Sequence, residues 1–178
     1  MQMSAEFWNG FYSGVFATLI GFALTMVWDV WKNWRTDKKR DRAILRALLH
    51  ECEENTSIGQ QNWDLLSQEL NALSEGKHLI VAMIPFKSGL WEVLRPSIPT
   101  KLLTDSDLLS LLRDISMLVA HLNEGFRSRQ TYKDTSGAMS NFNDRLKGVD
   151  GYLQGEVKQL QEALAKATTK LDSCEKAI

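Results

Sequence analysis

The first residues to consider for acid–base or metal chemistry are the three histidines, His50, His78 and His121. A helical metal site needs several ligands on one face, as in His-x-x-x-His or Glu-x-x-His arrangements. His50 and Glu54 share a face, but one such pair is common on charged helix surfaces, and a solvated face is the preferred interpretation. The sequence has no glycine-rich phosphate loop, Gly-x-Ser-x-Gly elbow or Cys-His nucleophile pair. We therefore predict no metal and no cofactor.

Two arginine–histidine pairs are the remaining candidates for catalysis. The stretch "RDISMLVAH" contains Arg113 and His121, and "RALLH" contains Arg46 and His50. In its helical pattern the chain resembles the HEPN family, all-α bundles whose ribonuclease members carry an Arg and a His at a fixed short spacing. Neither pair matches that spacing, so no catalytic residue is assigned. Cleavage of RNA by Arg113 and His121 stays the alternative to a non-enzymatic function.

A long uncharged segment lies near the start of the chain. The 22 residues from Phe7 to Trp28 carry no charged side chain, and as a helix they would rise about 33 Å, enough for a hydrocarbon core of about 30 Å. Aromatic residues stand at both ends, and indole and phenol rings favour a membrane interface. A helix buried in a soluble core is the alternative. We predict a transmembrane anchor over residues 1–34.

The residues after this segment are strongly basic. Six bases against the two acids Asp37 and Asp41 lie between residues 32 and 42, although the whole chain has a net charge of only −1. Positive charge on one side of a span predicts the cytoplasmic side, and a cleaved signal peptide would have its charge before the apolar run. We expect a single-pass protein of the bacterial inner membrane, with its N-terminus outside. The residues assigned to the interface and topology are Trp28, Trp31, Trp34, Lys38, Lys39 and Arg40.

Small residues recur along the same segment. Gly10, Gly14, Ala17 and Gly21 follow one another at spacings of four, three and four. Close backbone approach over small residues drives association of helices in lipid, and a seven-residue period implies a left-handed crossing. These four residues are the predicted self-association face, and a homo-oligomer is the expected state.

Residues 35–178 have the pattern of an all-α bundle with about four main helices. Their apolar stripes cover residues 44–52, 58–73, 108–126 and 146–174, with steps of three and four that are typical of amphipathic helices; the third helix is expected to begin near Thr104. The last of them follows a coiled-coil period and is a candidate surface for a protein partner. The proline-containing segment after residue 78 is expected to be a connector, a short strand or a loop.

The layout of one anchor, a basic cluster and a small divergent HEPN-like bundle resembles membrane-anchored accessory proteins of bacterial CRISPR and other antiphage systems. That resemblance implies oligomers that form pores or perturb the membrane after infection is sensed. The leading expectation is therefore a non-enzymatic, self-associating inner-membrane protein whose partners are the lipid bilayer and further copies. The alternatives are a membrane-tethered ribonuclease and a membrane-anchored scaffold module, and nucleic acid is not an expected partner.

Overall fold

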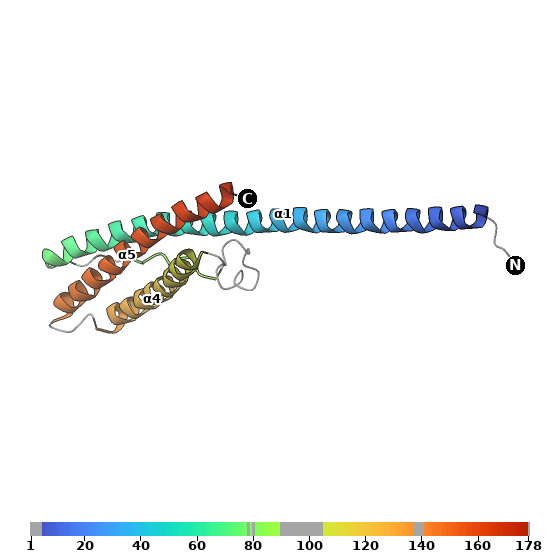
Figure 1. The fold of residues 1–178 in the computed structure, drawn as a ribbon. Coiled ribbons are helices and arrows are strands. Elements are labelled where there is room, and N and C mark those ends of the chain that lie inside the picture. Colours follow the sequence, from blue (N-terminus) through green and yellow to red (C-terminus); the bar gives the residue numbers. More distant parts are fainter. Residues whose placement is uncertain (1–4, 78, 80, 90–104, 137–140, 178) are drawn as a thin grey trace. The chain divides into compact units, whose positions relative to one another are not determined.

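The residues that the structure describes form three α-helices (Figure 1). The computed structural model describes residues 5–77, 79, 81–89, 105–136 and 141–177, with side chains from residue 18 onward except at residues 19 and 136. Helix α1 spans Ala5–Ser74, α4 spans Ser106–Ser136 and α5 spans Phe142–Lys176. These described ranges contain no β-strand. By its contacts the chain divides into two compact units, Met1–Asp41 and Arg42–Ile178, with the boundary inside α1.

The second unit is a helical bundle, as the sequence predicts. Buried apolar residues recur every three or four positions, the spacing that keeps one face of a helix on the core. On α4 they are Leu108, Leu112, Ile115, Val119, Leu122 and Phe126. On α5 they include Leu146, Leu153, Val157, Leu160, Leu164, Ala167 and Leu171, and α1 adds Ile44, Leu45, Leu48, Cys52, Leu66 and Leu73.

Local signals fix the helix ends of this unit. The Asp105 carboxylate accepts a hydrogen bond of 2.9 Å from the backbone N–H of Leu108, so Asp105 caps the N-terminus of α4. After α1, Gly76 adopts φ 73°, a conformation that favours glycine. There the N–H of Lys77 donates to the carbonyl of Ala72 at 2.9 Å, which closes the helix in a Schellman-type turn.

The predicted number of four main helices is wrong. The stripes at residues 44–52 and 58–73 belong to one continuous helix, α1. No proline lies between Cys52 and Ile58, and the Thr56 hydroxyl donates back to the Cys52 carbonyl at 2.8 Å without breaking the helix. Gly59 is also compatible with this helix, because the Gln161 side chain packs closely against it. The Cγ of Gln161 lies 3.2 Å from the position that a Cβ on Gly59 would take. The bundle is therefore built from α1, α4 and α5.

The predicted transmembrane helix is contradicted as well. Over the described side chains, no helix combines the length and the apolar character needed to cross a membrane. Charged residues lie on α1 from Asp29 onward. The anchor at residues 7–28 and the single-pass inner-membrane localisation are corrected accordingly.

Candidate functional site

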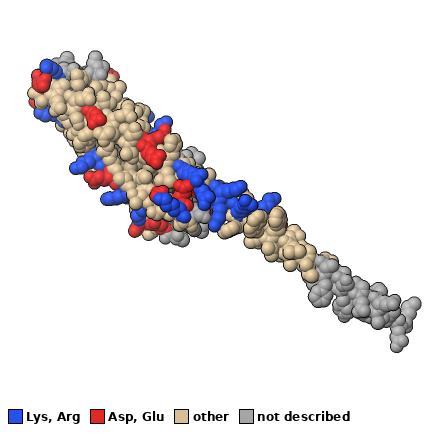
Figure 2. Space-filling model, turned by 90° about the horizontal axis from the view of Figure 1, so that it is seen from above, with Lys and Arg blue, Asp and Glu red and all other residues tan. Residues whose placement is uncertain are grey.

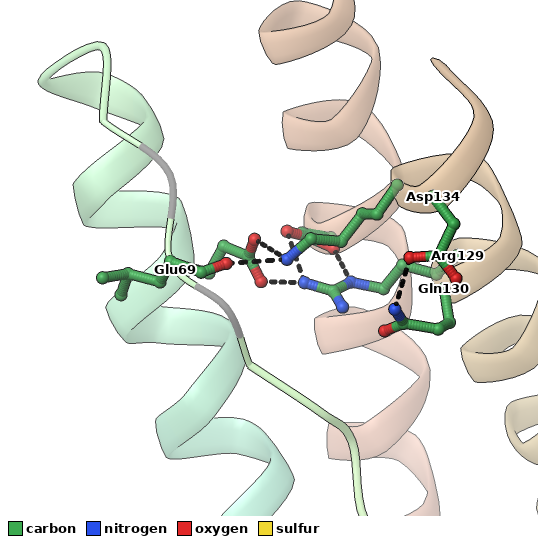
Figure 3. A network of polar contacts seen from close by, with 7 residues as sticks. Glu69, Arg129, Gln130 and Asp134 are labelled. Carbon is green, nitrogen blue, oxygen red and sulfur yellow. Dashed lines mark hydrogen bonds and ion pairs between the residues drawn. The ribbon is translucent and has the colours of Figure 1, made fainter. Parts of the chain in front are cut away.

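The core of the second unit contains a cluster of buried charges, which we call the charge network: Glu69, Arg129, Lys133 and Asp150 (Figure 3). Glu69 and Asp150 are fully buried and Arg129 is 2% exposed. Charged side chains are almost never buried to this extent unless they are paired. Each of the three helices contributes, because Glu69 lies on α1, Arg129 and Lys133 on α4, and Asp150 on α5.

Hydrogen bonds and ion pairs connect the four residues of the charge network. Arg129 Nε donates to Asp150 Oδ1 at 2.5 Å, and its Nη2 donates to Asp150 Oδ2 at 3.4 Å and to Glu69 Oε2. Lys133 Nζ donates to Glu69 Oε1 at 2.6 Å and to the carbonyl of Leu79 at 2.8 Å. Two cations thus balance two carboxylates. Since both carboxylates are held by cations, neither is available as a general base.

The environment lowers the pKa of Lys133 below its ordinary value of 10.5. Burial is the main cause, because it disfavours the charged ammonium, and the neighbouring Arg129 acts in the same direction. Asp150 and Asp134 oppose the shift. Burial and Arg129 thus disfavour the charged form of Lys133, whereas the carboxylates Asp150 and Asp134 favour it.

Three asparagines fasten the extended segment after α1 to the bundle. Asn62 donates to the carbonyl of Ile84 and accepts from its N–H, both at 2.8 Å. Asn123 binds the backbone of Phe86 in the same way at 2.8 and 3.0 Å, and Asn55 binds that of Lys87 at 2.8 and 3.1 Å. Each side-chain amide thus gives one donor and one acceptor to the backbone of a single residue, as a neighbouring β-strand would. We call this arrangement the asparagine clasps.

In the first unit, the described side chains of α1 are almost all exposed. Figure 2 shows Lys and Arg side chains gathered next to an uncharged stretch of this helix. Large apolar side chains here are 43% to 69% exposed: Ile20, Phe22, Leu24, Met26, Val27, Trp28, Val30, Trp31 and Trp34. Large exposed apolar surfaces are uncommon on monomeric soluble proteins.

The tryptophans at the end of this stretch contact one another and the basic residues. The rings of Trp28 and Trp31 have centroids 5.2 Å apart. The Arg35 guanidinium lies 5.4 Å from the Trp31 ring centroid, and Lys38 Nζ lies 4.1 Å from that of Trp34. These are cation–π distances. Arg40 instead forms ion pairs, with its Nη2 3.9 Å from the Oδ1 of Asp37 and of Asp41. Lys39 is exposed.

The predicted self-association face lies on the same helix. Of its four residues only Gly21 falls among the described side chains, and no atom lies within 4 Å of where a Cβ would be. Gly10, Gly14 and Ala17 belong to α1 by their backbone, but their side-chain surroundings lie outside the described residues.

The structure does not bring Arg113 and His121 together. Both lie on α4, and their separation of eight residues corresponds to about 12 Å along a helix. Arg113 is 3.8 Å from Asp114, with both side chains exposed, and His121 Nε2 is 3.0 Å from the Tyr152 hydroxyl. His50 Nε2 lies 4.0 Å from Glu54 on an exposed face. The described residues hold no group of His, Cys, Asp or Glu that could bind a metal ion.

Sequence reasoning missed the charge network, although its spacing contained a signal. From Leu146, steps of four and three lead to Asp150 and Leu153, and from Phe126, steps of three and four lead to Arg129 and Lys133. Asp150, Arg129 and Lys133 therefore lie at positions that the three- and four-residue spacing assigns to the core. Comparison with family models, curated proteins and solved structures finds no match for the chain.

Proposed function

We propose that this chain is a self-associating helical module in which residues 21–31 of α1 pair with the same segment of a second copy. The observation that carries the proposal is the exposed apolar surface of this segment. Fully burying one such side chain contributes about 1.5–3 kcal/mol. This segment has seven large apolar side chains with exposures of at least 43%, so pairing with a second copy would bury a large apolar area.

A seam for such a contact runs along one face of α1. Gly21, Leu24, Trp28 and Trp31 follow one another in steps of three, four and three, the spacing of helices that pack side by side. Gly21 has open space around it and offers a hole, whereas the two tryptophans offer large knobs. The seam is therefore complementary to itself in size.

An antiparallel pair uses this complementarity best. With the two segments crossing midway between Leu24 and Trp28, Gly21 of one copy lies opposite Trp31 of the other, and Leu24 lies opposite Trp28. The bases between residues 32 and 42 then point to opposite ends of the pair. A parallel pair would place these basic clusters next to each other, which costs free energy through like-charge repulsion.

The size of the full chain in solution tests the proposal. Sedimentation equilibrium at micromolar concentration should give a species larger than the monomer, and Leu24→Glu should shift it toward the monomer. Met117→Glu is the matched control, because Met117 is 61% exposed on the bundle and Leu24 is 66% exposed. A monomeric wild-type chain, or equal effects of the two substitutions, would contradict self-association through this seam.

Disulfide trapping tests the orientation. In a chain with Cys52 and Cys174 replaced by alanine, Gly21→Cys mixed with Trp31→Cys should give a mixed disulfide dimer under oxidation. A parallel pair would instead link Gly21→Cys to itself. Preferential formation of the Gly21→Cys homodimer would therefore overturn the antiparallel arrangement while leaving self-association intact.

A further inference from the structure

The extended segment at residues 81–89, which we call the strap, is attached to the bundle by side chains. It runs back along the second unit from the end of α1 (Figure 1). Its described backbone hydrogen bonds go to the side-chain amides of Asn55, Asn62 and Asn123. The backbone of an α-helix, by contrast, is bonded within the helix itself. Releasing the strap therefore breaks no hydrogen bond of a helix backbone.

A single buried side chain anchors the strap in the core. Phe86 is 3% exposed, and its ring stacks on that of Phe126 with centroids 6.0 Å apart. The other side chains of the strap are half-buried or exposed, and of these Met83 packs against the core. Segments with few buried apolar contacts open at free energies below that of global unfolding. The strap has this character, whereas the helices do not.

The strap also leaves space beside α4. A hollow of about 380 Å³ is lined on the strap side by Ala82, Met83 and Pro85, and its α4 side includes Arg129 of the charge network. The strap is therefore not packed against α4 along its whole length. This hollow lowers the number of contacts that must be broken when the strap leaves the bundle.

Glycines in conformations that favour glycine flank the strap. Gly76, before the strap, has φ 73°, and Gly89, its last residue, has φ 125°. At both positions no atom lies within 4 Å of the place that a Cβ would take. Small residues often absorb the backbone rotation of a hinge. Between them, Pro85 has a fixed φ and favours an extended Ile84, so the middle of the strap is stiff.

We propose that the strap opens as one unit, with Gly76 and Gly89 as its hinges and Phe86 as its latch, while the three helices stay folded. Opening withdraws the Phe86 ring from Phe126 and releases the three asparagines together. It also uncovers the α4 side of the hollow, which includes Arg129. The strap is thus a lid over this part of the bundle. It uses no residue of the α1 seam, so its opening does not depend on self-association.

Amide hydrogen exchange of the full chain, measured at low urea concentrations at which it stays folded, tests the proposal. The amides of Ile84, Phe86 and Lys87 should share one opening free energy that depends little on urea, because little surface is exposed. The amide of Leu160, inside α5, should exchange only through global unfolding, with a steep dependence on urea. Strap amides with the protection and urea dependence of Leu160 would overturn the proposal.

Asn123→Ala tests whether the strap moves as a unit. This substitution removes the partner of the Phe86 backbone and leaves the other two asparagines in place. Exchange at Ile84 and Lys87 should nevertheless accelerate by the same factor as at Phe86, at least about tenfold, because unpaired buried groups favour the open strap. Ser128→Ala, at an exposed position of the same helix, should leave all three rates unchanged. Acceleration at Phe86 alone would mean that the residues fluctuate independently, against the proposal.

Leu146→Ala separates opening of the strap from unfolding of the bundle. Leu146 is fully buried and packs with Leu73 and Phe142, in a cluster that does not contain Phe86. The substitution destabilises the closed and open forms equally, so exchange of the strap amides should not change. Exchange of the Leu160 amide should accelerate at least about thirtyfold. Equal acceleration of strap and Leu160 amides would show that the strap leaves only when the bundle unfolds. Circular dichroism establishes that the variant folds, and the urea series on the wild-type chain decides the same point without it.

Discussion

Arg129 of α4 and Asp150 of α5 form a two-point contact in the core, with Nε and Nη2 of the guanidinium donating to Oδ1 and Oδ2 of the carboxylate. The same Nη2 also donates to Glu69 of α1. One arginine thereby fixes the positions of all three helices relative to one another within the second unit. Such a bidentate pair adds geometric specificity as well as energy.

Removing one carboxylate of the charge network should be strongly destabilising. Asp150→Asn keeps the volume but leaves Arg129 with an incomplete set of partners in a buried site. Losing one partner of a buried ion pair costs about 3–5 kcal/mol. We expect a loss of this size in the free energy of unfolding measured with urea.

The control for this measurement is Glu162→Gln, an exposed carboxylate on the same helix. It should change the free energy of unfolding by less than about 0.5 kcal/mol, as is usual for surface positions. Equal effects of Asp150→Asn and Glu162→Gln would show that the charge network contributes little to stability.

The asparagine clasps give a second prediction. Asn62 is fully buried, and Asn62→Ala leaves the N–H and the carbonyl of Ile84 without their partner. Each buried polar group left unsatisfied costs about 1–3 kcal/mol. The free energy of unfolding should therefore fall by about 2–6 kcal/mol, with increased amide hydrogen exchange at Ile84. Gln61→Ala, at the exposed neighbouring position, should leave both measurements unchanged.

The helical phase of the bundle could be predicted from sequence because leucine spacing records it directly. The predicted α4 stripe from Leu108 to Phe126 is confirmed by the burial of its members at steps of three and four. The apolar pattern of residues 146–174 predicts Val149 on the core face of α5, but Val149 is 37% exposed, whereas Asp150 beside it is fully buried. Hydropathy alone predicts that Val149 faces the core. The regular spacing of core positions along α5 and the ion pair with Arg129 instead place Asp150 on that face.

The same effect explains the error in the number of helices. In α1 the core positions between Cys52 and Leu73 include Asn55, Asn62 and Glu69, so the apolar stripe is interrupted although the helix is not. The partners that make these polar residues acceptable in the core lie 32, 22 and 60 positions away along the chain. The spacing can place such polar residues on the core face, but a single sequence carries no record of which distant residues they pair with, so the contacts of the charge network and the clasps could not be predicted from it.

The two cysteines should differ in reactivity and in their effect on stability with pH. Burial, reinforced by Glu51 and Glu53, raises the pKa of the Cys52 thiol from 9.0 to about 11. The folded chain then keeps this proton up to about pH 11, whereas the unfolded chain loses it near 9.0. The stabilising contribution is therefore complete below pH 9 and is lost as the pH rises through 11.

Unfolding with urea at a series of pH values measures this contribution. The difference in the free energy of unfolding between wild type and Cys52→Ala should decline by about 1.4 kcal/mol per pH unit across this window. Lys133, whose pKa is lowered, contributes a change of opposite sign, but it is present in both chains and cancels in the difference.

At pH 8 a thiol reagent should label the half-buried Cys174 first and Cys52 only upon unfolding, since the thiolate is the reactive form. Rapid labelling of a folded Cys174→Ser chain would contradict the burial of Cys52.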